Sequence, residues 1–212
     1  MSLPTTTSET KVPSWTAQTV GMSSDILDRM ERAVAKVRER LLRTTGALEV
    51  AGIPYAVIGG NAVASWVATV DEGAVRNTRH VDLLVRRPDL PAITQALEGA
   101  GFVFHTAFGI IAFCDGPEGK PSEAVHLLFA GEKTRPDHLL PAPEIQTTSD
   151  PQRFRVILLE SLVLMKLMSN RRKDQVHLLD MIQVGLIDQS WVTRLPPELG
   201  ARLQHLFETP DE

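Results

Sequence analysis

The sequence lacks the features that mark a disulfide-stabilised or membrane-spanning protein. Its 212 residues include one cysteine, Cys114, so an internal disulfide is impossible and a reducing compartment is favoured. No run approaches the ~20 apolar residues that span a bilayer, and the N-terminus shows no basic region followed by an apolar run. We therefore expect a cytoplasmic protein that has no membrane partner.

The chain also lacks an excess of positive charge. It carries 22 Lys and Arg against 26 Asp and Glu, which gives a formal net charge of -4 and a pI of about 5.9. Proteins that bind duplex nucleic acid need a broad basic surface, so duplex DNA is not an expected partner, although a local basic patch stays open. With 43% hydrophobic residues, the length suits one globular domain that carries a helical appendage.

Hydrophobic periodicity predicts an α/β (α+β) architecture. Apolar residues recur at helical spacing after Ser24, which indicates a helix up to Gly52. Short apolar runs bounded by turn residues indicate strands over residues 55–58, 78–85, 102–104, 109–114 and 124–130, with a helix between Asp89 and Gly101. The fold expected is a mixed sheet flanked by helices.

The ends of the chain differ from this middle part. Residues 1–20 are rich in Thr, Ser and Pro, so we expect a flexible segment, followed by a core over residues 21–150 that includes the N-terminal helix. Residues 131–152 contain four prolines and indicate a long connection. From Leu158 the pattern is helical, which makes residues 151–212 a helical C-terminal region.

A glycine pair follows the first predicted strand. Gly59 and Gly60 allow a sharp turn, and Asn61 is suited to cap a helix that starts at the next residue. The backbone N–H groups of a glycine turn that leads into a helix can hold a phosphate group. A plain tight turn is the alternative interpretation.

The strand predicted over residues 78–85 carries an imidazole and a carboxylate two positions apart. Alternate residues of a strand point to the same face, so His80 and Asp82 should share one face while Val81 and Leu83 point to the core. This arrangement indicates a site.

Taken together, the glycine pair, the R-N-T-R-H-V-D segment, the strand AVHLLFAGE and the helical segment K-L-M-S-N-R-R-K-D resemble the nucleotidyltransferase superfamily that includes DNA polymerase beta. The closer resemblance is to the minimal bacterial AbiEii-like toxins, over roughly residues 50–190. It implies NMP transfer from an NTP to a protein or RNA acceptor, with a divalent metal, Mg²⁺ or Mn²⁺, held by three carboxylates.

The resemblance assigns roles to particular residues. Asp82 matches the second carboxylate, whereas His80 and His126 stand where the first and third would be. The residues that match nucleotide-binding positions are Gly59, Gly60, Asn61, Arg76, Thr78, Lys166 and Lys173. Lys166 on a largely apolar helix is also compatible with a surface lysine whose stem lies along apolar side chains.

Two imidazoles in place of two carboxylates should weaken the metal site. Mg²⁺ prefers anionic oxygen ligands, and the exchange removes two negative charges. Several interpretations of His80, Asp82 and His126 stay open. They are a degenerate site without catalysis, an impaired nucleotidyltransferase that uses Mn²⁺, a transition-metal site with two histidines and one carboxylate, and a wrong strand alignment. A function of a different class is a non-catalytic nucleotide-binding or antitoxin-like interaction module.

Overall fold

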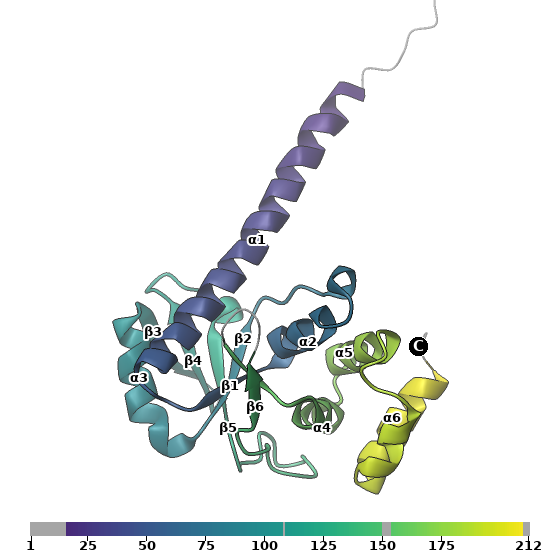
Figure 1. Ribbon diagram of the computed structural model, residues 1–212. Helices are drawn as coiled ribbons and strands as arrows, with labels where there is room; N and C mark the ends of the chain where they lie inside the picture. Colours follow the sequence, from purple (N-terminus) through teal and green to yellow (C-terminus); the bar gives the residue numbers. More distant parts are fainter. Residues whose placement is uncertain (1–15, 108, 150–153, 210–212) are drawn as a thin grey trace, which may run out of the picture.

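Within the described residues, one seven-stranded mixed sheet forms the centre of the protein (Figure 1). The structure is a computed structural model and describes residues 16–107, 109–149 and 154–209. The strands lie in the order β3-β4-β5-β2-β1-β7-β6. They are β1 (Tyr55–Ile58), β2 (Val81–Val85), β3 (Phe102–Ala107), β4 (Ile110–Asp115), β5 (Val125–Phe129), β6 (Thr147–Ser149) and β7 (Arg155–Ile157).

Two strand pairings position the later site. β1 and β2 are antiparallel with Ile58 opposite Asp82, whereas β2 and β5 are parallel with Asp82 opposite His126. All four residues of β1 are buried, as expected for an apolar strand at the centre of a sheet. The end of β1 and the starts of β2 and β5 therefore meet at one edge of the sheet.

Helices cover the sheet on two sides. In Figure 1, α1 and α3 lie to one side of the strands, and α2, α4, α5 and α6 lie to the other. The helices are α1 (Thr16–Val50), α2 (Gly59–Ala68), α3 (Leu90–Gly99), α4 (Leu159–Ser169), α5 (Arg172–Gln183) and α6 (Pro197–Glu208). Short 3-10 turns are η1 (Glu72–Ala74), η2 (Arg87–Asp89), η3 (Pro121–Glu123) and η4 (Gln189–Arg194).

The long helix α1 has two different halves. Its C-terminal half is held in the body through buried Leu41, Thr44 and Leu48 and through Arg40, whose guanidinium lies 3.2 Å from the Asp115 carboxylate. Its N-terminal half extends away from the body in Figure 1. Among the described residues, no helix has the length and apolar character needed to cross a bilayer.

Several element boundaries differ from the sequence prediction. The helix α1 begins at Thr16 rather than Ser24, because Ser and Thr inside a helix cost only a few tenths of a kcal/mol and do not force a start. Residues 1–15 of the expected flexible segment lie outside the described residues. The connection predicted over residues 131–152 contains β6, which pairs with β7. Strands of three residues leave too short a pattern to recognise in sequence.

Candidate functional site

A cavity of about 430 Å³ opens between the sheet and the C-terminal helices. Its sheet side is formed where β1 ends and where β2 and β5 begin, and its other walls come from α4, the start of α5 and the connection after β5. Ligand sites in proteins are usually concave and lie between structural elements, as this cavity does. The side chains on these walls determine what the cavity can bind.

His80, Asp82 and His126 lie together on the sheet side of the cavity. His126 Nδ1 is 3.4 Å from Asp82 Oδ1, and the ring centroids of His80 and His126 are 5.1 Å apart. Asp82 and His126 come from opposed positions of the parallel pair β2–β5. The structure therefore brings the three residues together, and their chemical role stays a prediction.

His80 lies before β2 rather than in it, because the strand begins at Val81 and not at Thr78. The Asn61 amide Nδ2 donates a hydrogen bond of 2.7 Å to the His80 carbonyl oxygen, which ties this segment to α2. Burial lowers the pKa of the His80 imidazole, although the nearby Asp82 charge acts in the opposite direction. His80 Nδ1 is buried and has no hydrogen-bond partner among the described residues.

The glycine pair is a point of close packing. Gly59 has φ +68°, and a Cβ atom at this position would overlap the Asp82 carboxylate. A Cβ atom at Gly60 would lie 2.8 Å from the Thr78 side chain. Any side chain at either position would thus push the 78–82 segment away from α2. This packing explains the glycine pair without a ligand, and a phosphate role for it stays a prediction.

Asn61 does not cap α2 as the sequence suggested. The helix starts two residues earlier, at Gly59, and Ile58 occupies the cap position without a side-chain hydrogen bond. The positive φ of Gly59 allows the chain to turn directly from β1 into the helix. The first turn of α2 therefore has no side-chain cap next to the cavity.

On the helical side, Lys166 is the centre of a buried polar cluster. Its side chain is largely buried, and Nζ lies 3.0 Å from Asp174 Oδ1 and 2.9 Å from His177 Nδ1. Arg171 Nε donates to the other oxygen of Asp174 at 2.7 Å. The alternative interpretation of Lys166 as a surface lysine is wrong, because the residue is buried. Its ion pair with Asp174 compensates the charge of the buried ammonium group.

The pKa values of this cluster follow from burial and charge. Burial lowers the pKa of Lys166, and Asp174 acts against this shift. Burial would raise the pKa of Asp174, but the Arg171 hydrogen bond and the Lys166 charge outweigh it and lower the pKa to about 2. Burial and the Lys166 charge lower the pKa of His177 to about 4. At neutral pH the His177 ring is therefore neutral and can accept the Lys166 hydrogen bond.

Cationic side chains outnumber carboxylates around the cavity. The cationic residues that line it are Arg87, Lys133, Arg135, Lys166, Arg171 and Lys173, and the carboxylates are Asp82, Glu132 and Asp174. Two of these carboxylates are already paired with cations, since Glu132 binds Arg87 at 2.5 Å and Asp174 binds Lys166 and Arg171. Arg135 is paired as well, with the Asp137 carboxylate 3.1 Å from its Nε. The side chains that line the cavity nevertheless include more cations than carboxylates, although the whole chain is acidic.

Three of the predicted nucleotide-binding residues do not reach this cavity. Asn61, Arg76 and Thr78 line a second cavity of about 520 Å³ under α1. Arg76 Nε is also 2.7 Å from the Asp180 carboxylate of α5, which occupies its guanidinium. Gly60 is buried against Thr78. These four residues therefore lie outside the lining of the first cavity, and their predicted role stays a prediction.

The cavity does not fit the divalent metal that the resemblance implied. Among the described residues, no group of three or more His, Cys, Asp or Glu side chains is arranged to hold a metal ion. Of the three cavity carboxylates, only Asp82 is not bonded to Lys or Arg, and the two groups next to it are imidazoles. Mg²⁺ takes hard oxygen ligands, so these donors are unsuitable for it.

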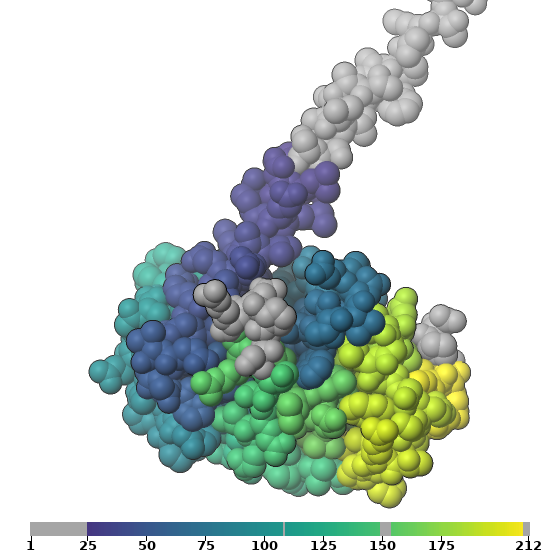
Figure 2. Space-filling view, in the orientation of Figure 1, coloured from purple at the N-terminus to yellow at the C-terminus, as the bar shows by residue number. Residues whose placement is uncertain are grey.

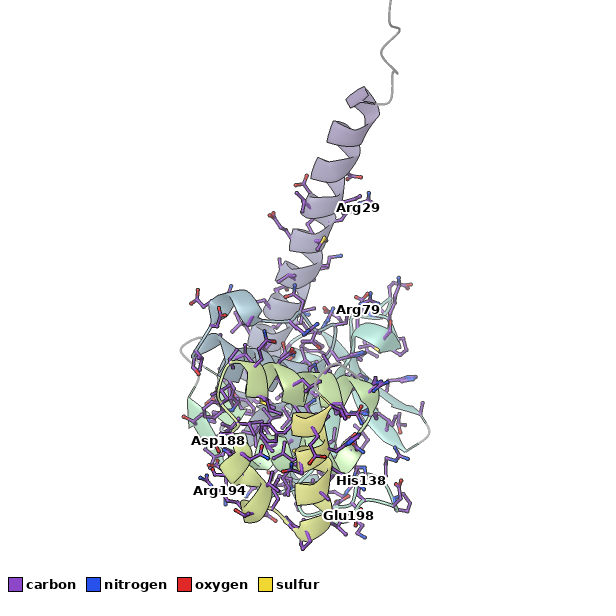
Figure 3. All side chains as sticks on the ribbon, turned by 90° about the vertical axis from the view of Figure 1, so that its right-hand side faces the viewer. Arg29, Arg79, His138, Asp188, Arg194 and Glu198 are labelled. Carbon is purple, nitrogen blue, oxygen red and sulfur yellow. The ribbon has the colours of Figure 1, made fainter. Side chains whose placement is uncertain are left out.

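The connection after β5 adds residues that the sequence interpretation left without a role. Lys133, Arg135 and His138 line the cavity, and His138 Nε2 is buried without a hydrogen-bond partner among the described residues. Figure 3 labels His138. Burial also lowers the pKa of this imidazole. The only sequence signal was the cluster of charged residues in a proline-rich stretch, which is equally typical of an exposed loop.

Comparison with known proteins gave matches in structure alone. No family model and no curated protein matches the sequence. Two solved structures of the antibiotic-resistance factor ANT(2'')-Ia match the fold. The solution structure has 13% identity and a TM-score of 0.52, and covers 84% of this chain and 94% of its own. The crystal structure with adenylyl-2''-tobramycin has 14% identity and a TM-score of 0.51, and covers 84% and 99%.

These matches decide the fold. The chain has a nucleotidyltransferase-type fold. This confirms the expected mixed sheet flanked by helices. A nucleotidyltransferase-like protein from Paracoccidioides brasiliensis also matches, with 18% identity, a TM-score of 0.49, and coverage of 84% of this chain and 91% of its own. The finer resemblance to the minimal AbiEii-like type stays a prediction, as do the antitoxin-like role and the bacterial source.

Proposed function

We propose that this protein binds a nucleoside triphosphate in the 430 Å³ cavity through cationic side chains, and that metal-dependent NMP transfer is impaired. The observation that carries the proposal is the excess of Lys and Arg over carboxylates around a cavity where the family resemblance implies three acids. A triphosphate brings several negative charges. Cations in the wall can offset these charges in the place of metal ions.

The uncapped start of α2 supports the same ligand class. The backbone N–H groups of a first helical turn carry partial positive charge and favour anions. Ile58 and Gly59, where α2 begins, line the cavity next to His80 and Asp82. A neutral His80 ring carries one N–H, which can donate to a phosphate oxygen.

Impaired transfer follows from the surroundings of Asp82. Phosphoryl and nucleotidyl transfer depend on positioning and on stabilisation of charge, to which metal ions contribute most in enzymes of this type. Among the carboxylates that line the cavity, Asp82 alone has no Lys or Arg partner in the described part of the chain, and its contact is with the His126 imidazole, 3.4 Å away. A protein or RNA acceptor matters only for residual transfer. ANT(2'')-Ia was crystallised with adenylyl-2''-tobramycin, so a small molecule belongs among the acceptors to test.

Calorimetric titration with ATP, GTP, CTP and UTP in EDTA tests the binding proposal. At least one nucleotide should bind without metal, and the double variant Lys173→Ala with Arg135→Ala should weaken that binding on the order of tenfold, about 1.4 kcal/mol. Lys36→Ala on the exposed half of α1 is the matched control and should leave the affinity unchanged. A folded wild-type protein that binds no nucleotide, or binds only with Mg²⁺, would overturn the proposal.

Restoring the carboxylates tests the impaired-transfer part separately. The double change His80→Asp with His126→Asp should make nucleotide binding depend on Mg²⁺, because three carboxylates then face one another. Transfer of label from α-labelled NTP to RNA, protein or tobramycin should be absent in the wild type. Wild-type transfer that Asp82→Ala abolishes would show an active enzyme. Unchanged affinity in the folded double variant would mean that the strand alignment is wrong.

A further inference from the structure

The connection after β5 forms a closed loop at one wall of the cavity. Gly131 N donates a hydrogen bond of 3.0 Å to the Ala142 carbonyl oxygen, and Ala142 N donates one of 2.8 Å to the Glu132 carbonyl oxygen. Ala142 is buried, and Leu140 packs against the core. We call residues 131–142 the β5 loop. In Figure 1 it runs beside α4, and Figure 2 shows the green middle of the chain packed against the yellow-green C-terminal helices.

Within the β5 loop, His138 has a ring nitrogen that is available to a ligand. The backbone N–H of His138 donates to the Arg135 carbonyl oxygen at 3.1 Å, which fixes the position of the residue in the loop. His138 lines the cavity, and its Nε2 atom is buried and has no hydrogen-bond partner among the described residues. A buried polar atom without a hydrogen bond is unfavourable, so nearly all such atoms in proteins have a partner.

The charged groups around His138 are already compensated within the chain. Each of the three guanidinium groups whose charges act on this imidazole is paired with a carboxylate. The pairs are Arg135 with Asp137 at 3.1 Å, Arg171 with Asp174 at 2.7 Å and Arg202 with Glu198 at 2.7 Å. Burial lowers the pKa of His138, so at pH 7 its ring is neutral and has one N–H donor and one acceptor nitrogen. Such a ring suits an uncharged polar group.

Apolar side chains form much of the cavity wall. α4 contributes Leu162, Met165 and Met168, and the sheet contributes Ile110 and Leu128. A planar ring fits such walls, because its faces gain from contact with aliphatic and thioether groups while its edge still needs hydrogen bonds. In a nucleoside triphosphate, the base is the part that has apolar faces and an edge of amino and carbonyl groups.

The cavity extends from the phosphate side proposed above to the β5 loop. β2 and β5 are parallel, so His80 and His126 lie where these strands begin, whereas the β5 loop follows the end of β5 at Phe129. His126 and Phe129 both line the cavity and are three residues apart, which is about 10 Å along a strand. Figure 3 shows Arg79, the residue before His80, near the top of the body and His138 in its lower half.

We propose that His138 determines the base specificity of the nucleotide site, through a hydrogen bond between its Nε2 atom and the edge of the base. The inference rests on the nucleotide binding proposed above, and it adds which part of the ligand reaches the β5 loop. The triphosphate then lies towards the uncapped start of α2. A ring nitrogen pairs with either an amino or a carbonyl group, so a base with the wrong group at that point leaves Nε2 unpaired.

Calorimetric titration in EDTA with the four NTPs and with inorganic tripolyphosphate tests the inference. The wild type should bind its preferred NTP at least about threefold more tightly than the weakest one, as expected for one neutral hydrogen bond. His138→Phe keeps a planar ring without nitrogen, so it should remove this preference and leave the affinity for tripolyphosphate unchanged. His138→Gln should retain part of the preference. His105→Phe, at an exposed position of β3 outside the cavity lining, is the matched control and should change nothing.

Urea denaturation of the same variants distinguishes specificity from a structural role. Because Nε2 has no partner in the described part of the chain, His138→Phe should not lower the denaturation midpoint. A lower midpoint for both His138→Phe and His138→Gln would show a structural role instead. Equal affinity of the wild type for all four NTPs, or an unchanged preference in folded His138→Phe, would overturn the inference while the nucleotide proposal stands. A wild type that binds neither an NTP nor tripolyphosphate would overturn both.

Discussion

Two carboxylates, Asp82 and Asp174, line the same cavity in very different surroundings. Asp174 is buried and is bonded to two cations, Lys166 and Arg171. Asp82 is about one-quarter exposed, and its ion-pair partner is the His126 imidazole, 3.4 Å away. The first carboxylate is part of the structural framework, and the second is available to a ligand.

The difference indicates that Asp174 stabilises the walls of the cavity, whereas Asp82 can interact with a ligand. The Lys166–Asp174–His177 cluster joins α4 to α5, so its charges are already compensated within the protein. Near Asp82, by contrast, some hydrogen-bonding capacity is not satisfied within the described residues, as for Nδ1 of His80. A ligand gains more from unpaired groups than from groups whose bonds it would have to replace.

The largest expected effect is on folding stability at Asp174. The change Asp174→Ala leaves the buried Lys166 charge without its ion pair, which typically costs about 3–5 kcal/mol. Asp82→Ala should cost less than about 1 kcal/mol, because its side chain is partly solvated. Urea denaturation at pH 7 measures both values.

A double change sharpens this contrast. Replacing the pair by apolar residues, Lys166→Met with Asp174→Leu, should recover part of the loss, because no charge is then left buried. If Asp82→Ala destabilises the protein as much as Asp174→Ala, the two carboxylates do not have the different roles described above.

The second effect concerns the glycine below Asp82. Gly59→Ala combines an unfavourable positive φ with an overlap between Cβ and the Asp82 carboxylate. The control is Gly116→Ala, at φ +78° with no atom within 4 Å, where only the backbone term of about 1–2 kcal/mol applies. Gly59→Ala should cost about 1–3 kcal/mol more than the control, because crowding adds to the backbone term.

A rescue experiment checks this reason. Adding Asp82→Gly to Gly59→Ala should remove the crowding and return the cost to that of the control. A cost that stays the same after the rescue would show that the close approach of the glycine to Asp82 is not the cause. Equal costs for Gly59→Ala and Gly116→Ala would lead to the same conclusion.

Patterning in the sequence predicted the larger elements of the fold and the residues on the sheet side of the cavity. Apolar runs such as Tyr55–Ile58 indicate buried strands whatever their neighbours are. The pairing of Asp82 with His126 followed only from the family resemblance, because strand order depends on contacts far apart in sequence. Strands as short as β6 could not be predicted from the sequence, because three residues do not establish an alternating pattern.

The helical side of the cavity was harder to predict. Lys166, Asp174 and His177 are separated by up to eleven positions and by the turn at Asn170, whose φ of 46° reverses the chain. The helical pattern suggests that Lys166 lies on a helix, but not that α5 folds back to place Asp174 beside it. Likewise, no local pattern shows that His138 faces the cavity, because its position depends on the course of the whole connection.

The smallest expected effect is a pH dependence of stability that distinguishes the two clusters. The pKa of His177 falls from 6.5 to about 4 on folding, so the unfolded chain binds more protons between these pH values. Stability should be full above pH 6.5 and should decrease as the pH drops towards 4, by about 1–2 kcal/mol after allowance for solvent screening. His80 acts in the same direction, because burial lowers its pKa too.

Two variants distinguish the contributions of His177 and His80 to this pH dependence. His177→Gln keeps an acceptor for Lys166 without titrating, so it should remove more of the dependence of stability on pH than His80→Gln does. Urea denaturation between pH 7 and 4.5 measures both. Equal slopes for the two variants would show that His177 is as open to solvent as the sheet-side imidazoles.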